Sequence, residues 1–212
     1  MRRPGHRFRC SRHRAGHQLT RIGSSLARAG TQERGVVDGL QNRVALVTGA
    51  SSGIGKALSL QLVSCGATVI GISRSRDKQQ AVVNKARTLK GTFIPYEMDI
   101  SDYASCREIF ETFSKEFDHL DILINNAGVG HFSAFEKMPS SDYQFILNTN
   151  LMAPLHLTHL LIDLLKKSKS ARIINISSSG AFYGISFRGI YCASKAGLRV
   201  WSQALAAELK HV

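Results

Sequence analysis

Residues 44–55 read Val-Ala-Leu-Val-Thr-Gly-Ala-Ser-Ser-Gly-Ile-Gly, an apolar run followed directly by a glycine-rich turn. The apolar run predicts a buried strand, and the residues after the turn have helix-like spacing. Gly49 can adopt the positive φ of a tight turn, Gly53 lets backbone N–H groups approach a pyrophosphate, and Gly55 lets helix and strand pack closely. A phosphate would lie at the helix N-terminus, where unpaired N–H groups favour anions. The stretch therefore predicts a dinucleotide-binding turn.

The rest of the chain after residue 42 alternates short apolar runs with amphipathic stretches, the order expected of βαβ units. We expect strands near 44–47, 67–72, 92–97, 121–124 and 172–176, and helices near 54–65, 77–90, 103–117, 142–167 and 191–210. Right-handed crossovers would place the C-terminal ends of all strands at one edge of the sheet, where ligands bind. The sequence predicts an α/β fold, a Rossmann-like doubly wound parallel sheet.

Three further motifs follow the glycine-rich turn: Asn125-Asn126-Ala127-Gly128, Ser177-Ser178-Ser179 and Tyr191-Cys192-Ala193-Ser194-Lys195. In this order the four motifs resemble the short-chain dehydrogenase/reductase family, in its TGxxxGxG, NNAG, Ser and YxxxK form. The resemblance runs from about Arg43 to Val212. It implies an oxidoreductase that interconverts a carbonyl and an alcohol by hydride transfer.

The pair Tyr191 and Lys195 stands at i and i+4, so both side chains share one face of a predicted helix. A phenol with the ordinary pKa of about 10 is a poor acid or base near neutrality, whereas an adjacent ammonium favours the phenolate and lowers that pKa. The pattern therefore predicts an acid–base tyrosine tuned by a lysine. The resemblance also implies that Lys195 holds the nicotinamide ribose.

Two more residues complete the Ser-Tyr-Lys-Asn site that the resemblance implies. Ser178, thirteen residues before the tyrosine, would stabilise charge on the substrate oxygen, with Ser177 and Ser179 as the alternatives. Asn150 would hold a water of the family's proton relay, and Asn148 is the alternative.

Cofactor choice depends on the residues that follow the second expected strand. Ser73 stands where a carboxylate would select NAD(H), and Arg74 stands where a cation would face the 2′-phosphate of NADP(H). We therefore expect NADP(H), whereas NAD(H) stays open if Arg74 and Arg76 only solvate a loop. The cofactor contacts implied by the resemblance are Gly49, Ser51, Ser52, Gly53, Ile54, Gly55, Arg74, Asp99, Ile100, Asn126, Ala127, Gly128, Tyr191 and Lys195.

Charge is unevenly distributed along the chain. The net charge is +13, and residues 1–40 contribute nine basic and two acidic residues, so the remainder is only modestly basic. This Arg-rich, acid-poor extension fits a mitochondrial transit peptide and equally fits a disordered extension, which leaves a cytoplasmic or mitochondrial location open. The body has no basic aromatic stripe, so nucleic-acid binding is not favoured.

Composition otherwise agrees with a globular α/β chain, at 43% apolar and 20% charged residues. No uninterrupted apolar run approaches the roughly 18 residues of a spanning helix, so we expect no transmembrane segment. The histidines, among them His131, His156 and His159, show no metal-ligand constellation, so we expect no metal.

The expected substrate is a small, hydrophobic carbonyl or alcohol compound. Six apolar residues can line a cleft or can equally belong to the core: Phe132, Phe135, Phe182, Tyr183, Ile185 and Phe187. The chain stops at Val212, whereas the family continues into further strands, so we expect residues 41–212 to form a C-terminally incomplete domain with five strands. The alternative function is a dinucleotide-binding module with impaired catalysis, from a truncated product. The family resemblance also implies a homo-oligomer.

Overall fold

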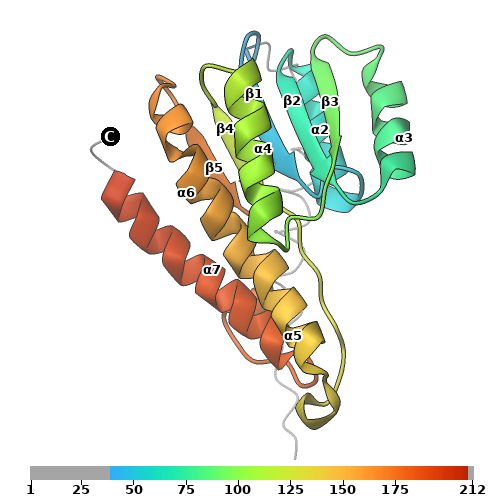
Figure 1. The fold of residues 1–212 in the computed structure, drawn as a ribbon, viewed down its shortest axis with the longest axis vertical. Helices are drawn as coiled ribbons and strands as arrows, with labels where there is room; N and C mark the ends of the chain where they lie inside the picture. Colours follow the sequence, from blue (N-terminus) through green and yellow to red (C-terminus); the bar gives the residue numbers. More distant parts are fainter. Residues whose placement is uncertain (1–38, 210–212) are drawn as a thin grey trace, which may run out of the picture. The chain divides into compact units, whose positions relative to one another are not determined.

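A parallel sheet of five strands forms the centre of the fold (Figure 1), for which a computed structural model describes residues 39–209. Almost all of the Arg-rich extension assigned to residues 1–40 lies outside the described residues. The strands are β1 (Val44–Thr48), β2 (Thr68–Ser73), β3 (Thr92–Glu97), β4 (Ile122–Asn125) and β5 (Arg172–Asn175), in the order β3-β2-β1-β4-β5. All neighbouring strands are parallel, and the order reverses between β1 and β4. The doubly wound sheet is confirmed.

Helices cover both faces of this sheet (Figure 1), with α4, α6 and α7 on the face turned to the viewer and α2 behind it. The α-helices are α2 (Gly53–Ser64), α3 (Arg76–Ala86), α4 (Tyr103–Glu116), α5 (Ser140–Leu147), α6 (Ala153–Lys166) and α7 (Gly189–Glu208). Short 3-10 helices occur at η1 (Phe135–Lys137) and η3 (Ser179–Ala181). The expected alternation of strands and helices is thus present from β1 to α7.

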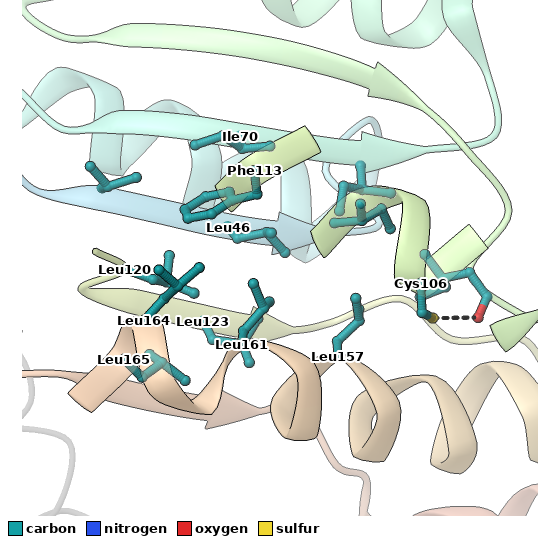
Figure 2. Packing of buried hydrophobic residues seen from close by; sticks show 14 of the residues in the cluster. Leu46, Ile70, Cys106, Phe113, Leu120, Leu123, Leu157, Leu161, Leu164 and Leu165 are labelled. Carbon is teal, nitrogen blue, oxygen red and sulfur yellow. Dashed lines mark hydrogen bonds between the residues drawn. The ribbon is translucent and has the colours of Figure 1, made fainter. Parts of the chain in front are cut away.

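The core consists of two apolar clusters separated by the sheet. Successive residues of a strand point to opposite faces, so Leu46 belongs to one cluster and its neighbours Ala45 and Val47 belong to the other. Figure 2 shows the first cluster, in which Leu46, Ile70 and Leu123 of the sheet meet side chains of α4 and α6. Val63 of α2 and Val82 of α3 pack against the opposite face. Burying each such side chain contributes about 1.5 to 3 kcal/mol, which fixes the sheet as a rigid support for the loops at its edge.

The expected helix at 142–167 is present as one helical segment, Ser140–Lys166, but its hydrogen-bonding pattern changes in the middle. A π-helical turn, η2 (Asn148–Met152), separates α5 from α6 and buries Thr149 and Asn150. Pro154, in the first turn of α6, has no N–H to donate to a carbonyl one turn earlier. The lost bond favours a local change of hydrogen-bonding pattern, and π turns often lie at functional sites.

The combined helical segment Ser140–Lys166 is 27 residues long with a mean hydropathy of 1.2 in its most apolar window. By length and composition alone it would be able to cross a membrane, and it is the one such segment among residues 39–209. Within the fold, however, α6 buries seven residues, including Leu157 and Leu161, against the sheet. A core helix meets the same criteria, so the segment is not a clear membrane span.

The strand β5 lies at one edge of the sheet and pairs with β4. Its residues alternate in exposure, and Ile174 is 42% exposed. The expected five strands are therefore all present within the described residues, with β5 as an edge strand.

Candidate active site

The candidate site lies where the C-terminal ends of β1 and β4 meet, at the point where the strand order reverses. Thr48 ends β1, and its Oγ1 accepts hydrogen bonds from the backbone N–H groups of Asn126 and Ala127, each at 3.0 Å. In turn, Nδ2 of the Asn126 side chain donates a hydrogen bond of 2.9 Å to the Thr48 carbonyl. These bonds hold the glycine-rich turn and the loop after β4 in one fixed relation.

The glycine-rich turn has the shape that its sequence predicts. Gly49 has a φ of 68° and Gly53 a φ of 51°, both in the left-handed region. A Cβ at Gly49 would lie 2.8 Å from Nδ2 of Asn126, and one at Gly55 would lie 2.4 Å from the Gly49 carbonyl oxygen. A Cβ at Gly53, in contrast, would meet open space. Two glycines thus permit close packing, and the third faces the space where a ligand can approach.

The N-terminus of α2 opens toward this space. Ser52 precedes the helix, yet its side chain caps no backbone N–H, and the first turn contains no acidic residue. The first N–H groups of an α-helix have no partner within the helix, so they can bind an anion. The uncapped helix fits the pyrophosphate of a dinucleotide.

A cavity of about 220 Å³ continues from the turn toward β2 and β3. Two hydroxyl groups that line this cavity, Oγ of Ser73 and Oγ1 of Thr149, are buried without a hydrogen-bond partner. Buried polar groups are normally satisfied, so two unpaired hydroxyls at one cavity indicate that a polar ligand belongs there. The residues present therefore fit the adenosine half of a dinucleotide.

Of the residues expected on the adenosine side, Ile100, Ala127 and Gly128 line this cavity, and so do Arg74 and Asp99. Arg74 and Asp99 lie 3.8 Å apart as an exposed ion pair, and the guanidinium of Arg74 is 5.4 Å from the ring centroid of Phe145. Lys78 of α3 also lines the cavity, and sequence reasoning missed it. Arg74 precedes α3 whereas Lys78 lies in its first turn, so no helical spacing in the sequence pointed to Lys78.

A second cavity of about 670 Å³ contains the expected acid–base pair. Tyr191 and Lys195, on the first turns of α7, line this cleft together with Gly53 of the glycine-rich turn. Lys195 is 4% exposed, and its Nζ donates a hydrogen bond of 2.8 Å to the Ile176 carbonyl. Burial lowers the pKa of Lys195 to about 8. The lysine is therefore charged near neutral pH but close to losing its proton.

Asn150, fully buried on the π turn, acts as a clamp on the loop after β4. Its Oδ1 accepts from the Val129 N–H at 2.8 Å, and its Nδ2 donates to the Val129 carbonyl at 2.8 Å. The same Nδ2 donates to Oγ of Ser194 on α7 at 3.1 Å. A Cβ at Gly128 would lie 3.4 Å from both Oδ1 of Asn150 and Nζ of Lys195, so the clamp adjoins the cleft. The alternative, Asn148, is exposed on the same turn.

The aromatic residues expected either in a pocket or in the core are mostly in neither place. Phe132 lines the cleft and is 63% exposed. Four others are exposed outside the cleft lining: Phe135, Phe182, Tyr183 and Phe187. Ile185 is half-buried. The alternative in which these residues form the core was wrong for the five aromatic residues, because all five are exposed.

Comparison with known proteins decides the family. The family model described as short chain dehydrogenase matches residues 43–212. The chain belongs to the short-chain dehydrogenase family. It is 33% identical over 171 residues to a 3-oxoacyl-(acyl-carrier-protein) reductase, FabG, of Thermotoga maritima, covering 79% of this chain and 70% of that protein.

Further members of the short-chain dehydrogenase family agree in sequence and in structure. A 3-ketodihydrosphingosine reductase of Bacteroides thetaiotaomicron is 34% identical, with 80% of this chain and 60% of that protein covered. The crystal structure of a metagenomic short-chain oxidoreductase in complex with NADP superposes with a TM-score of 0.77 at 32% identity, covering 81% of this chain and 78% of that one. The chain thus spans only part of the length of these relatives.

The short-chain dehydrogenase family is a family of oxidoreductases, and the relatives and the NADP complex support a nicotinamide dinucleotide as the cofactor. Members of the family generally act on small molecules and form oligomers. No group of three or more His, Cys, Asp or Glu side chains suited to a metal ion occurs within residues 39–209.

The serine of this short-chain dehydrogenase remains a prediction. Ser178 precedes η3, and its Oγ accepts a hydrogen bond from the Gly180 N–H at 3.2 Å. Ser177, the neighbouring alternative, lines the cleft, and its Oγ donates to the Lys195 carbonyl at 3.3 Å. Both hydroxyls are half-buried, so burial does not distinguish them.

Proposed function

We propose that this chain catalyses the NADPH-dependent reduction of a carbonyl group to an alcohol, and the reverse oxidation, with Tyr191 as the acid–base residue. The observation that carries the proposal is one cleft lined by Tyr191, Lys195 and the glycine-rich turn. Relatives named as 3-oxoacyl-(acyl-carrier-protein) reductase and 3-ketodihydrosphingosine reductase support a carbonyl as the reducible group.

The chemistry divides between cofactor and chain. A bound nicotinamide dinucleotide supplies the hydride that adds to the carbonyl carbon. Tyr191 donates the phenolic proton to the carbonyl oxygen, so that an alcohol forms and a phenolate remains until it takes up a proton from water. The Lys195 ammonium, buried in the cleft wall, stabilises that phenolate. Ser178 stabilises the developing charge on the substrate oxygen in this scheme.

Asn150 has a positioning role in the same scheme. By holding both backbone polar groups of Val129, it fixes the loop that lines both cavities. A water bound near this clamp would pass protons between solvent and Lys195, as the family resemblance implies. The rigid loop keeps the proton-donating group and the cofactor-binding turn in one geometry.

The preference for NADPH over NADH rests on the charge at the adenosine-side cavity. Arg74 and Lys78 are both at its wall, and no acidic residue follows β2 before Asp77. An additional phosphate would compete with Asp99 for the Arg74 guanidinium, and charge-assisted bonds to phosphate are strong. We expect Arg74→Ala to raise the Kd of NADPH about ten- to a hundred-fold and to change the Kd of NADH little.

The proposal is tested by following NADPH consumption spectrophotometrically with a panel of ketones and aldehydes. Tyr191→Phe should lower kcat by about 10²- to 10⁴-fold while cofactor binding persists, because it removes the proton and little else. Tyr183→Phe is the matched control, since Tyr183 is 61% exposed and lies outside the lining of the cleft. Near-normal turnover by Tyr191→Phe would refute the assignment.

Cofactor-dependent stabilisation without turnover would favour the alternative, a dinucleotide-binding module with impaired catalysis. Thermal unfolding of the full chain, with NADPH and NADH titrated separately, distinguishes the two functions. A shift in Tm accompanied by turnover supports the reductase, and a shift with no turnover on any carbonyl tested supports the module.

A further inference from the structure

The substrate side of the cleft combines an aromatic surface with a cation. His131 and Phe132 belong to the loop after β4, and Arg188 is the residue immediately before α7. These residues line the same cavity as Tyr191. They come from other segments of the chain than the glycine-rich turn, which follows β1. The aromatic and cationic side chains of this part of the lining therefore belong to two loops rather than to the sheet.

The two loops are joined to each other. Ser133 donates its backbone N–H to the Phe187 carbonyl at 3.0 Å, and the rings of Phe132 and Phe187 lie 5.2 Å apart. The Arg188 guanidinium carbon is 5.9 Å from the ring centroid of Phe132. The contacts form an exposed aromatic surface at the cleft with a guanidinium resting beside it, a placement that orients Arg188 without neutralising it.

The charge of the cleft is one-sided. Its lining residues include Arg188, His131 and Lys195 but no Asp or Glu, as far as the described part of the chain extends. His131 is held by Asp142, with Nδ1 and Oδ2 2.7 Å apart, and Lys195 is buried against a backbone carbonyl. Arg188, in contrast, is exposed and makes no ion pair with any residue from 39 to 209.

The start of α7 adds no competing negative charge. No side chain caps this helix, and its first turn contains no acidic residue. Arg188 immediately precedes α7, Tyr191 lies in the first turn of that helix, and both side chains line the same cavity. An anion bound by Arg188 would thus lie close to the residue that protonates the carbonyl.

We propose that Arg188 determines substrate specificity by pairing with an anionic group, a carboxylate or a phosphate, that the carbonyl substrate carries, while Phe132, packed against Phe187, covers its apolar part. This inference rests on the proposed reductase function and narrows its substrate class to acidic carbonyl compounds. Arg188 is the suited partner because a guanidinium can bind either oxyanion with two parallel hydrogen bonds.

The kinetic test compares matched substrates that differ in charge: 4-carboxybenzaldehyde, 4-formylphenyl phosphate and the neutral methyl 4-formylbenzoate. The full chain should give a higher kcat/KM for at least one anionic aldehyde than for the ester, and the preferred anion identifies carboxylate or phosphate. Arg188→Gln should lower this anion-to-ester ratio about ten- to a hundred-fold, the range for a lost charge-assisted bond. Arg188→Lys should retain part of it.

Arg87→Gln is the matched control, because Arg87 is an exposed arginine at the end of α3, outside both cavities. Its anion-to-ester ratio should equal that of the unmodified chain. An unchanged ratio in Arg188→Gln, or a preference of the unmodified chain for the ester, would overturn the proposal. Thermal unfolding of each variant shows whether a lost preference for the anion reflects lost folding. If Arg188→Gln does not fold, Arg188→Lys is the test: it should retain part of the anion-to-ester ratio, and a ratio equal to that of the unmodified chain would overturn the proposal.

A binding measurement separates this proposal from failure of the reductase function. Calorimetric titration of 4-acetylbenzoate, and separately of phenyl phosphate, into the chain saturated with NADP⁺ requires no turnover. Heat of binding that is lost in Arg188→Gln and kept in Arg87→Gln supports the anion site even if no carbonyl is reduced. Binding that is absent, or equal in the two variants, overturns it whatever the turnover.

Discussion

Replacing Asn150 by alanine removes the clamp between the π turn and the loop after β4. The side chain makes three hydrogen bonds, two of 2.8 Å with the backbone of Val129 and one of 3.1 Å with Oγ of Ser194. Ser194 keeps a partner, because its hydroxyl also donates to the Tyr191 carbonyl at 2.7 Å. The variant therefore leaves two backbone polar groups of Val129 unpaired.

The expected loss follows from those two groups. Each polar group left unpaired in a buried place costs about 1 to 3 kcal/mol, and Val129 is only half-buried. We therefore expect Asn150→Ala to lower the free energy of unfolding by about 2 to 4 kcal/mol. Equilibrium urea denaturation at 25 °C measures this difference, if the denaturant slope m is unchanged between the proteins.

The matched control is Asn148→Ala, on the same π turn but exposed to solvent. This control should lower the free energy of unfolding by less than about 0.5 kcal/mol, as most surface substitutions do. Asn150→Ala should also reduce the rise in Tm on adding NADPH, since Val129 lines both cavities. A loss below about 1 kcal/mol, or one equal to that of the control, would refute the role of Asn150 as a clamp.

Burial lowers the pKa of Lys195 to about 8, so the lysine is charged below that pH. The rate of carbonyl reduction measured across a pH series should therefore fall as the pH rises above about 8. Lys195→Arg should move this fall to higher pH. Ser178→Ala should lower kcat at least ten-fold more than Ser177→Ala, roughly the share of one hydrogen-bond donor in stabilising an oxyanion, and the reverse order in steady-state assays would transfer the role to Ser177. Gly55→Ala should abolish the NADPH-induced rise in Tm, since its Cβ would lie 2.4 Å from the Gly49 carbonyl oxygen, and a normal rise would show that the turn can relax. Leu161→Ala should lower the free energy of unfolding by about 2 to 5 kcal/mol in urea denaturation, because Leu161 is fully buried between α6 and the sheet, and a loss below 1 kcal/mol would contradict that packing.

The strands were predictable because each is a short apolar run bounded by polar or glycine residues. β1, for example, was expected at 44–47 and is observed at Val44–Thr48. The glycine-rich turn was predictable for a related reason, since Gly49 and Gly53 adopt backbone angles that other residues rarely tolerate. Local signals of this kind are present in a few adjacent residues.

Features that depend on distant partners were not predictable. The clamp of Asn150 on Val129 joins residues 21 positions apart, and no spacing rule announces it. The π turn, in contrast, had a local signal in Pro154, but the regular apolar periodicity around it indicated an uninterrupted α-helix. Phe182 and Phe187 are exposed although their apolar side chains would suit a core. The path of the loop, and not the type of side chain, decides whether such a residue is buried.

The hydrogen bonds between Thr48 and Asn126 have a consequence for how the chain matures. They connect residues 78 positions apart, so the glycine-rich turn can reach its final shape only after β4 has been synthesised and has paired with β1. Long-range pairing of this kind forms slowly during folding. We therefore expect a nascent chain that has not reached Asn126 to lack these bonds and to bind a dinucleotide less tightly than a chain in which β1 and β4 have paired. A cofactor that binds only the folded sheet would then stabilise the native state relative to the unfolded chain.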